Sequence, residues 1–456
     1  MKVVVAIDSF KGSLTSLEAA ESIKKGIENA CKAEVTISPI ADGGEGTVDA
    51  LVAGMHGRLI TSKVTGPLGE KVDASWGIIE EAGHKTAVIE MAAAAGIILM
   101  KRDSLNPLFT TTYGVGEIIK EAILQGCRDF IIGIGGSATN DGGAGMLQAL
   151  GFDLLNADGS QIARGAIGLK ELKSISDDNV VAGLRECNFR IACDVKNPLC
   201  GDNGCSAVYG PQKGAGPEMI KDMDEWLYNY SLISGGNAAY PGTGAAGGLG
   251  YAFLTFLEGE LEPGIDIILE ATGLEQKIKG ADVVVTGEGR MDSQTIMGKV
   301  PVGVAAIAKR YNKKVIAFCG CATEDAGICN EYGIDSFFSI LRNPVSLEEA
   351  LDRDKASDNL TKTAEQVFRL YSAGSELGDI NLGAWKNVDT TYNDIREKSL
   401  MQWLDEIEVH DDIAVRGGVK LVREYLKHLE TDNERLQDEI KLKNKYLMKL
   451  KERVEQ

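Results

Sequence analysis

Hydrophobic and polar positions alternate along the chain in a way that separates strand-like from helix-like stretches. Short β-branched runs at 3–7 and 35–41 are each followed by a helix-compatible stretch, at 16–30 and 46–54. Ser16 stands where the N-cap of the first helix is expected. Because strand and helix follow one another in this order, the pattern predicts an α/β fold that begins with a βαβ unit.

The pattern changes near residue 57 and returns near residue 262. Residues 58–92 alternate as strands broken by Gly-rich turns, which predicts an antiparallel region. After residue 278 the strand-helix alternation resumes; its elements are expected at 282–286, 299–310, 314–319, 335–340 and 357–371. A domain that begins, is interrupted and resumes indicates an insertion. We therefore predict a flavodoxin-like or Rossmann-like parallel-sheet domain at 1–56 and 262–373, and an inserted mixed α/β domain at 57–261.

The C-terminal region has a different composition, with dense charge and no strand pattern. We predict a linker at 374–389 and a helical segment at 390–456, in which 415–450 keeps a heptad. The core positions are Val422, Leu426, Leu429, Asn433, Leu436, Ile440, Leu447 and Leu450. One polar Asn in such a seam favours a parallel dimer, so self-association through a coiled coil is expected. A single amphipathic helix packed on the catalytic body is the alternative.

The junction at 374–377 reads Gly-Ser-Glu-Leu, which two adjacent cloning sites could encode. An engineered fusion and a natural extension therefore both stay open for the C-terminal segment. In the first case the preceding residues would act as a carrier for a coiled-coil dimerisation or interaction segment.

Charge and hydropathy narrow the classes of partner. The formal net charge is −19, which argues against nucleic acid or an anionic membrane as a ligand, because either needs a basic face. The sequence has no long apolar segment of the signal-peptide or membrane-spanning kind. Its nine cysteines lack a Cys-x-x-Cys spacing, as expected of reduced thiols in the cytoplasm.

Four predicted strand ends carry glycine together with small polar or charged side chains, at 3–13, 35–46, 130–145 and 281–293. Glycine lets the backbone turn tightly so that N–H groups point at anions. Any one such loop could be a surface turn, but the carboxyl ends of parallel strands share one edge, where ligands bind. The candidate binding residues in these loops are Asp8, Ser9, Asp42, Glu45, Gly135, Gly136, Ser137, Asn140, Asp141 and Glu288.

Two further stretches hold polar residues beside apolar ones. Asp194 is expected inside an apolar strand, where an unpaired carboxylate would be costly; it is either paired in the core or faces the site. Lys213 stands in a nearby polar break and is a further binding candidate. The Gly-rich run at 242–250 opens a helix and is either a close packing surface or a phosphate cradle.

The kinds of reactive group in these loops favour phosphoryl transfer. Only four histidines occur, none of them in a Gly-rich loop, and no Gly-x-x-x-x-Gly-Lys-Ser/Thr sequence is present. Carboxylates, lysines and backbone amides suit a reaction that depends on positioning and charge neutralisation. A dinucleotide-dependent dehydrogenase is the rival enzyme class, because Gly133-x-Gly135-x-x-Ala138 follows a strand. The expected acidic residue about 20 positions later is missing, which argues against it.

Eight stretches carry a close resemblance to a known family. They are 7–14 (IDSFKGSL), 41–47 (ADGGEGT), 64–69 (VTGPLG), 89–96 (IEMAAAAG), 133–146 (GIGGSATNDGGAGM), 193–199 (CDVKNPL), 210–215 (GPQKGA) and 286–295 (TGEGRMDSQT). In this order they resemble the bacterial glycerate kinase family of the glycerate 2-kinase type, over residues 1–373. The resemblance implies a two-domain α/β kinase with its active cleft between the domains.

The resemblance also implies a reaction: ATP and Mg²⁺ phosphorylate D-glycerate, with 2-phosphoglycerate favoured over 3-phosphoglycerate. For that reaction we expect Lys11 and Arg290 to neutralise the transferred phosphoryl group. Asp194 and Asp292 are the candidates for accepting the hydroxyl proton and for holding Mg²⁺. Ser137 and the amides around Gly135 and Gly136 would bind phosphate or the glycerate carboxylate.

Overall fold

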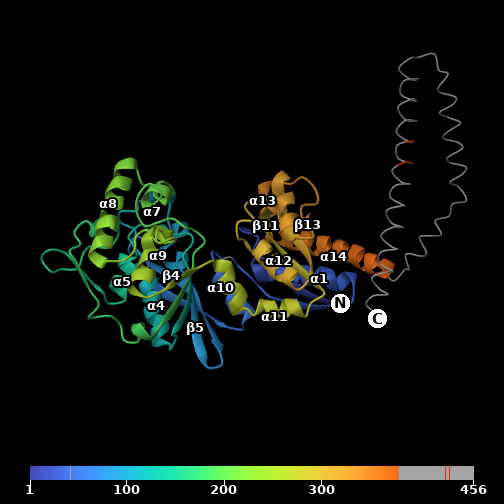
Figure 1. The fold of residues 1–456 in the computed structure, drawn as a ribbon, viewed down its shortest axis with the longest axis horizontal. Helices are drawn as coiled ribbons and strands as arrows, with labels where there is room; N and C mark the ends of the chain where they lie inside the picture. Colours follow the sequence, from blue (N-terminus) through green and yellow to red (C-terminus); the bar gives the residue numbers. More distant parts are fainter. Residues whose placement is uncertain (42, 379–426, 428–430, 432–456) are drawn as a thin grey trace, which may run out of the picture. The chain divides into compact units, whose positions relative to one another are not determined.

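The computed structural model describes residues 1–41, 43–378, 427 and 431 (Figure 1). Asp42, the predicted helical segment with its heptad seam, and the predicted linker beyond residue 378 therefore lie outside the described residues, apart from positions 427 and 431. Helix α14, Arg353–Gly378, includes the first residues of that predicted linker, which are thus helical.

The first sheet is fully parallel and has the strand order β13-β12-β11-β1-β2. Its strands are β1 Lys2–Val5, β2 Glu34–Ile37, β11 Val283–Met291, β12 Lys314–Ala322 and β13 Ser336–Ser339. Val4 pairs with Thr36 on one side and with Val284 on the other. In chain order this is the 2-1-3-4-5 arrangement of doubly wound folds, whose order reverses between β1 and β11.

The second sheet is mixed, with the order β10-β9-β6-β5-β4-β3. Its strands are β3 Arg58–Thr65, β4 Lys71–Glu81, β5 His84–Glu90, β6 Asp129–Gly133, β9 Asn188–Ala192 and β10 Glu260–Glu262. The pairs β3–β4 and β4–β5 are antiparallel, and the others are parallel. Strands β7 Asp153–Leu155 and β8 Ser174–Ser176 form a separate antiparallel pair. The predicted α/β class is confirmed, while the predicted domain boundaries stay a prediction.

Helices cover both faces of each of the two large sheets. They are α1 Ser16–Ala30, α2 Thr47–Gly54, α3 Ala92–Ala95, α4 Tyr113–Leu124, α5 Ala144–Ala149, α6 Ala166–Leu169, α7 Cys205–Tyr209, α8 Pro217–Ser234, α9 Ala245–Phe256, α10 Gly264–Ala271, α11 Leu274–Lys279, α12 Val300–Arg310, α13 Leu347–Leu351 and α14. Helices α1 and α14 pack on one face of the first sheet, and α10, α11 and α12 share a core with its other face. This is the layering expected of a doubly wound sheet.

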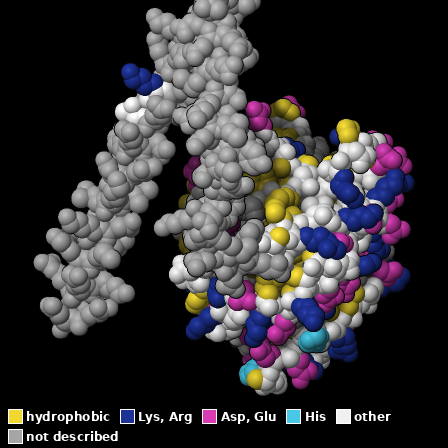
Figure 2. Space-filling model, turned by 90° about the vertical axis from the view of Figure 1, so that its right-hand side faces the viewer, with side chains coloured by type: hydrophobic (Ala, Val, Ile, Leu, Met, Phe, Trp, Pro, Cys, Tyr) yellow, Lys and Arg dark blue, Asp and Glu magenta, His cyan; other side chains and the backbone are white. Residues whose placement is uncertain are grey.

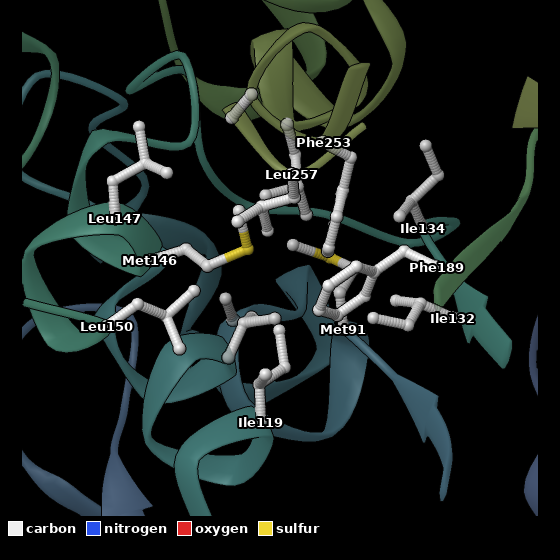
Figure 3. Close-up of a cluster of buried hydrophobic side chains, with 14 of the residues drawn as sticks. Met91, Ile119, Ile132, Ile134, Met146, Leu147, Leu150, Phe189, Phe253 and Leu257 are labelled. Carbon is white, nitrogen blue, oxygen red and sulfur yellow. The ribbon is translucent and has the colours of Figure 1, made fainter. Parts of the chain in front are cut away.

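The core of the second sheet lies between its strands and helices α4, α5 and α9. Figure 3 shows this cluster, in which the side chains of Met91 and Met146 reach toward its centre. Phe130 and Phe189 stack with ring centroids 4.8 Å apart. The opposite face of the same sheet shares a hydrophobic core with α2, α10 and the first sheet, since Ile79, Val88 and Ile131 belong to that cluster.

The first helix spans the predicted residues 16–30, but its N-cap lies one residue earlier than predicted. Thr15, not Ser16, is the N-cap: its hydroxyl accepts from the Glu18 amide, and the Glu18 carboxylate accepts from the Thr15 amide, a capping box. The Ser16 hydroxyl instead donates to the Ile7 carbonyl at 2.6 Å and accepts from the Ile40 amide at 2.9 Å. Ser16 therefore ties the chain after β1 to the chain after β2.

The Gly-rich run at 242–250 serves close packing. Ala246, Gly247 and Gly248 have left-handed backbone conformations at the start of α9. A Cβ at Gly247 would lie 2.0 Å from the Thr139 carbonyl oxygen, and one at Gly248 would lie 2.8 Å from Gly142 Cα. The glycines thus let α9 approach the loop after β6, which favours the packing alternative over a phosphate cradle.

No helix in the described part of the chain is both long and apolar enough to cross a membrane. On the face shown in Figure 2, basic side chains are interspersed with acidic ones.

Candidate active site

A cleft of about 1200 Å³ lies where the carboxyl ends of strands from both large sheets meet. Loops that follow β1, β2, β5, β6 and β9 line it, together with the short 3₁₀ helix Pro211–Lys213. The predicted site residues in its lining are Ser9, Lys11, Glu45, Gly135, Gly136, Ser137, Asp194 and Lys213. The carboxyl-edge rule thus brings residues from three of the four predicted loops into one cleft.

Glycine is required where the loops after β2 and β6 approach each other. A Cβ at Gly133 would lie 2.4 Å from the Gly43 carbonyl oxygen, a distance that no side chain could tolerate. Gly136, with φ +72°, adopts a conformation that glycine enters without steric cost. The backbone of 133–136 can therefore reach the cleft at close quarters.

Lys213 is a buried cation at the wall of this cleft, only 2% exposed. Its Nζ donates to the Ser137 hydroxyl at 2.8 Å and to the Thr139 carbonyl at 2.6 Å. Among the described residues no carboxylate forms an ion pair with it. Burial lowers the pKa of Lys213 to about 8, because desolvation disfavours the ammonium form. An anion entering the cleft would supply the missing counter-charge.

Glu90 is a half-buried carboxylate that the sequence reasoning did not select. It ends β5 and lines the cleft, and its Oε1 accepts from the Val48 amide at 2.9 Å. Burial, together with the nearby Asp49, raises the pKa of Glu90 to about 7, against the lowering effect of the backbone amides of residues 46–48. The sequence does contain a feature that could have identified Glu90: it is an acidic residue directly after the apolar residues of β5, like the acidic residues of the other loops.

Asp194 does not lie within an apolar strand, so that prediction was wrong. Strand β9 ends at Ala192, and Asp194 is exposed two residues later, in the lining of the cleft. Its Oδ1 accepts from the Gly264 amide at 3.0 Å, at the beginning of α10. The expected burial cost therefore does not arise, and Asp194 lies in the lining of the cleft.

The end of β11 forms a polar cluster outside the lining of the cleft. Buried Glu288 accepts from the Thr295 hydroxyl at 2.6 Å and pairs with Lys299 at 3.2 Å. Burial raises the pKa of Glu288. Arg290 pairs with Asp292 at 3.2 Å. The structure therefore does not bring Asp292 into the lining beside Asp194.

This cluster adjoins the loop after β1. A Cβ at Gly289 would lie 3.4 Å from the Lys11 amide nitrogen, and the Asp8 amide donates to the Gly287 carbonyl at 3.0 Å. Asp8 is buried in this loop, and its Oδ1 accepts from the Ser9 amide at 2.7 Å.

Asn140 and Asp141 are fully buried and do not line the cleft. Asp141 accepts from the Thr112 amide at 2.8 Å, the Thr112 hydroxyl at 2.9 Å and the Gly143 amide at 3.1 Å. Asn140 donates to the Ser206 hydroxyl at 2.8 Å. The structure therefore gives both residues internal hydrogen-bonding partners, where the sequence predicted contacts with a ligand.

The donor set of the cleft is compatible with Mg²⁺ bound together with phosphate. In the residues the structure describes, no group of three or more His, Cys, Asp or Glu side chains could hold a metal ion by itself. Mg²⁺ at nucleotide sites, however, usually takes one or two carboxylates and completes its shell with water and phosphate oxygens. Asp194 and Glu45 offer such carboxylates in the lining.

Comparison with known proteins gives a single family. The sequence profile of the "Glycerate kinase family" matches residues 3–372. The chain is 46% identical over 381 residues to "Glycerate 2-kinase" of Escherichia coli strain K12, covering 82% of this chain and 99% of that protein. It is 47% identical over 373 residues to "Glycerate kinase" of Bacillus subtilis strain 168, covering 80% and 97%. A crystal structure assigned as glycerate kinase 2 of Salmonella typhimurium LT2 superposes with a TM-score of 0.75 at 46% identity, covering 83% of this chain and all of that one.

Proposed function

Because the chain belongs to the glycerate kinase family and is therefore a kinase, we propose that it phosphorylates D-glycerate with ATP and Mg²⁺. The hydroxyl we favour is the one on C2, which gives 2-phosphoglycerate. The name of the Escherichia coli relative, glycerate 2-kinase, supports this choice over 3-phosphoglycerate.

One observation carries the proposal: at the wall of the cleft, beside a serine and a glycine loop, lies a buried lysine that forms no ion pair with any carboxylate in the described part of the chain. Glycerate is a small carboxylate with no other charge. Such an anion would meet the cation of Lys213 and the hydroxyl of Ser137. The backbone amides of Gly135 and Gly136 offer it further hydrogen-bond donors. We assign the glycerate carboxylate to this part of the cleft.

The nucleotide is assigned to the first sheet, where the strand order reverses between β1 and β11. Ligands of doubly wound sheets bind at this point, outside the carboxyl ends of the strands. The loop 9–15 lies there and contributes Lys11 to the cleft, while Arg290 lies near the end of β11 and Asp292 directly follows it. Asp194 would hold Mg²⁺, which neutralises charge on the phosphates when bound.

The proposed reaction is tested directly by product identification. Purified protein, ATP, Mg²⁺ and D-glycerate should yield ADP and 2-phosphoglycerate, with the phosphorus resonance coupled to the C2 proton. Formation of 3-phosphoglycerate alone would correct the hydroxyl assignment, and the absence of any phosphoglycerate would refute the proposal.

The titration of Lys213 gives a second expectation. Its ammonium form, which would bind the glycerate carboxylate, predominates below a pKa of about 8 and is lost as the pH rises through that value. KM for glycerate should therefore increase about tenfold between pH 7 and pH 9. Steady-state kinetics at saturating ATP measure this, and a KM that stays constant to pH 9 would exclude Lys213 as the anion-binding cation.

A further inference from the structure

We propose that the Glu90 carboxylate accepts the proton of the glycerate hydroxyl that is phosphorylated. This inference rests on the proposed function and names a residue for which neither the Gly-rich motifs nor the four predicted loops gave a role. It replaces Asp292, which does not line the cleft, and leaves Asp194 for Mg²⁺.

The sheet places Glu90 next to the assigned carboxylate site. Strand β5 is the neighbour of β6, and Glu90 pairs with Gly133 in the parallel register. Adjacent strands lie about 4.8 Å apart, and a Cβ on Gly133 would be 3.8 Å from Glu90 Cγ. The anion loop Gly135–Ser137 begins two residues beyond Gly133, so Glu90 lies beside the strand that carries the loop.

The chemistry of the substrate makes this proximity decisive. The C2 hydroxyl of glycerate is attached to the carbon that carries the carboxylate, so a base for it must lie within a few Å of the carboxylate site. Glu90 lies on the β5 side of β6, where it pairs with Gly133, and Asp194 follows β9 on the other side, where Gly133 pairs with Ala192. The two carboxylates therefore flank the same loop.

Their environments differ, and the difference assigns their roles. Asp194 is exposed, which suits a ligand of Mg²⁺, an ion that keeps several waters. Glu90 is half-buried and held by the Val48 amide, and a carboxylate has further acceptor sites besides the one this bond occupies. A base is most effective when its pKa lies near the working pH, and that of Glu90 is raised to about 7.

Several charged groups lie near Glu90 or line the same cleft. Asp49, on the first turn of α2, raises the pKa of Glu90. Among the residues that the structure describes, the other charged ones in the lining of the cleft are Lys11, Glu45, Asp194 and Lys213. Because the negative charge of Asp49 raises the pKa of Glu90, removal of that charge should lower the pKa of Glu90.

The step balances as follows. The glycerate C2 oxygen forms a bond to the γ-phosphorus, the bond from that phosphorus to the β,γ-bridging oxygen breaks, and the electron pair leaves with ADP. The hydroxyl proton passes to Glu90, which later releases it to water. Nothing is oxidised or reduced.

The test compares Glu90→Gln with Asp49→Asn. Gln keeps an oxygen that can accept from the Val48 amide but cannot take the proton, so kcat should fall about 100-fold or more with little change in KM for either substrate. The acid limb of the kcat profile, centred near pH 7 in the native protein, should disappear. In Asp49→Asn the limb should persist but move to lower pH.

Glu90→Asp separates chemistry from folding. This variant keeps an ionisable group and should retain the acid limb of the kcat profile with a reduced kcat. If Glu90 had only a structural role, the acid limb would stay at its native pH in all of these variants. Native-like turnover and an unchanged limb in Glu90→Gln would overturn the inference. If the native protein makes phosphoglycerate in that experiment, the proposed function stands and only the role of Glu90 is refuted.

Discussion

Replacing Lys213 by Met should raise KM for glycerate about 100-fold at pH 7 and leave KM for ATP nearly unchanged. A hydrogen bond to a charged group contributes roughly 1.5–3 kcal/mol, and 1.4 kcal/mol is a factor of ten. The free energy of unfolding should change little, because Met fills a similar volume and removes a cation that is 2% exposed and forms no ion pair with a carboxylate among the described residues. Steady-state kinetics and urea denaturation measure both quantities.

Lys309→Met is the matched control for this variant. Lys309 pairs with Asp335 and does not line the cleft, so KM for glycerate should stay at its native value. An equal rise of KM in both variants, or a Lys213→Met protein with native KM, would contradict the assignment of the carboxylate site.

Replacing Asp141 by Ala should lower the free energy of unfolding by about 3 kcal/mol. The carboxylate is fully buried and accepts from the Thr112 amide and hydroxyl and from the Gly143 and Gly145 amides. Each buried donor left without a partner costs roughly 1–3 kcal/mol. Loss of a buried carboxylate, whose pKa is raised by desolvation, offsets part of that cost. Urea denaturation measures the difference.

Asp103→Ala serves as the control, since Asp103 is exposed and its replacement should change stability by no more than about 0.5 kcal/mol. The opposite pattern is informative too. A stable Asp141→Ala protein that has lost substrate binding would restore the predicted role of Asp141 as a ligand-contacting residue.

The sequence predicted the elements and the loops better than the direction of each side chain. The strand patterns at 3–7 and 35–41 correspond to β1 and β2, and the carboxyl-edge rule brought their loops into one cleft. Within the loop after β6, however, Ser137 lines the cleft while Asp141 is buried. A run of glycines has no hydrophobic period, so nothing in it distinguishes a side chain that faces solvent from one that faces the core.

Glu90 shows a second reason for incomplete prediction. Its surroundings depend on the amides at the start of α2, which lie more than 40 positions earlier in the chain. Register between β5 and β6 also brings it beside Gly133. Neither relation is local, so the raised pKa that draws attention to Glu90 depends on tertiary packing rather than on residues beside it in the sequence.

The order of strands in the first sheet has a consequence for biosynthesis. β1 pairs with β2 and with β11, and in the second pair Val3 lies opposite Val283. The ribosome adds Val283 on the order of tens of seconds after Val3, so this pair cannot form before then. All strands of the second sheet, from β3 to β10, emerge during that interval. We expect the nascent chain to pair β3 to β10 first, and to leave one edge of β1 unpaired and available to chaperones until β11 emerges.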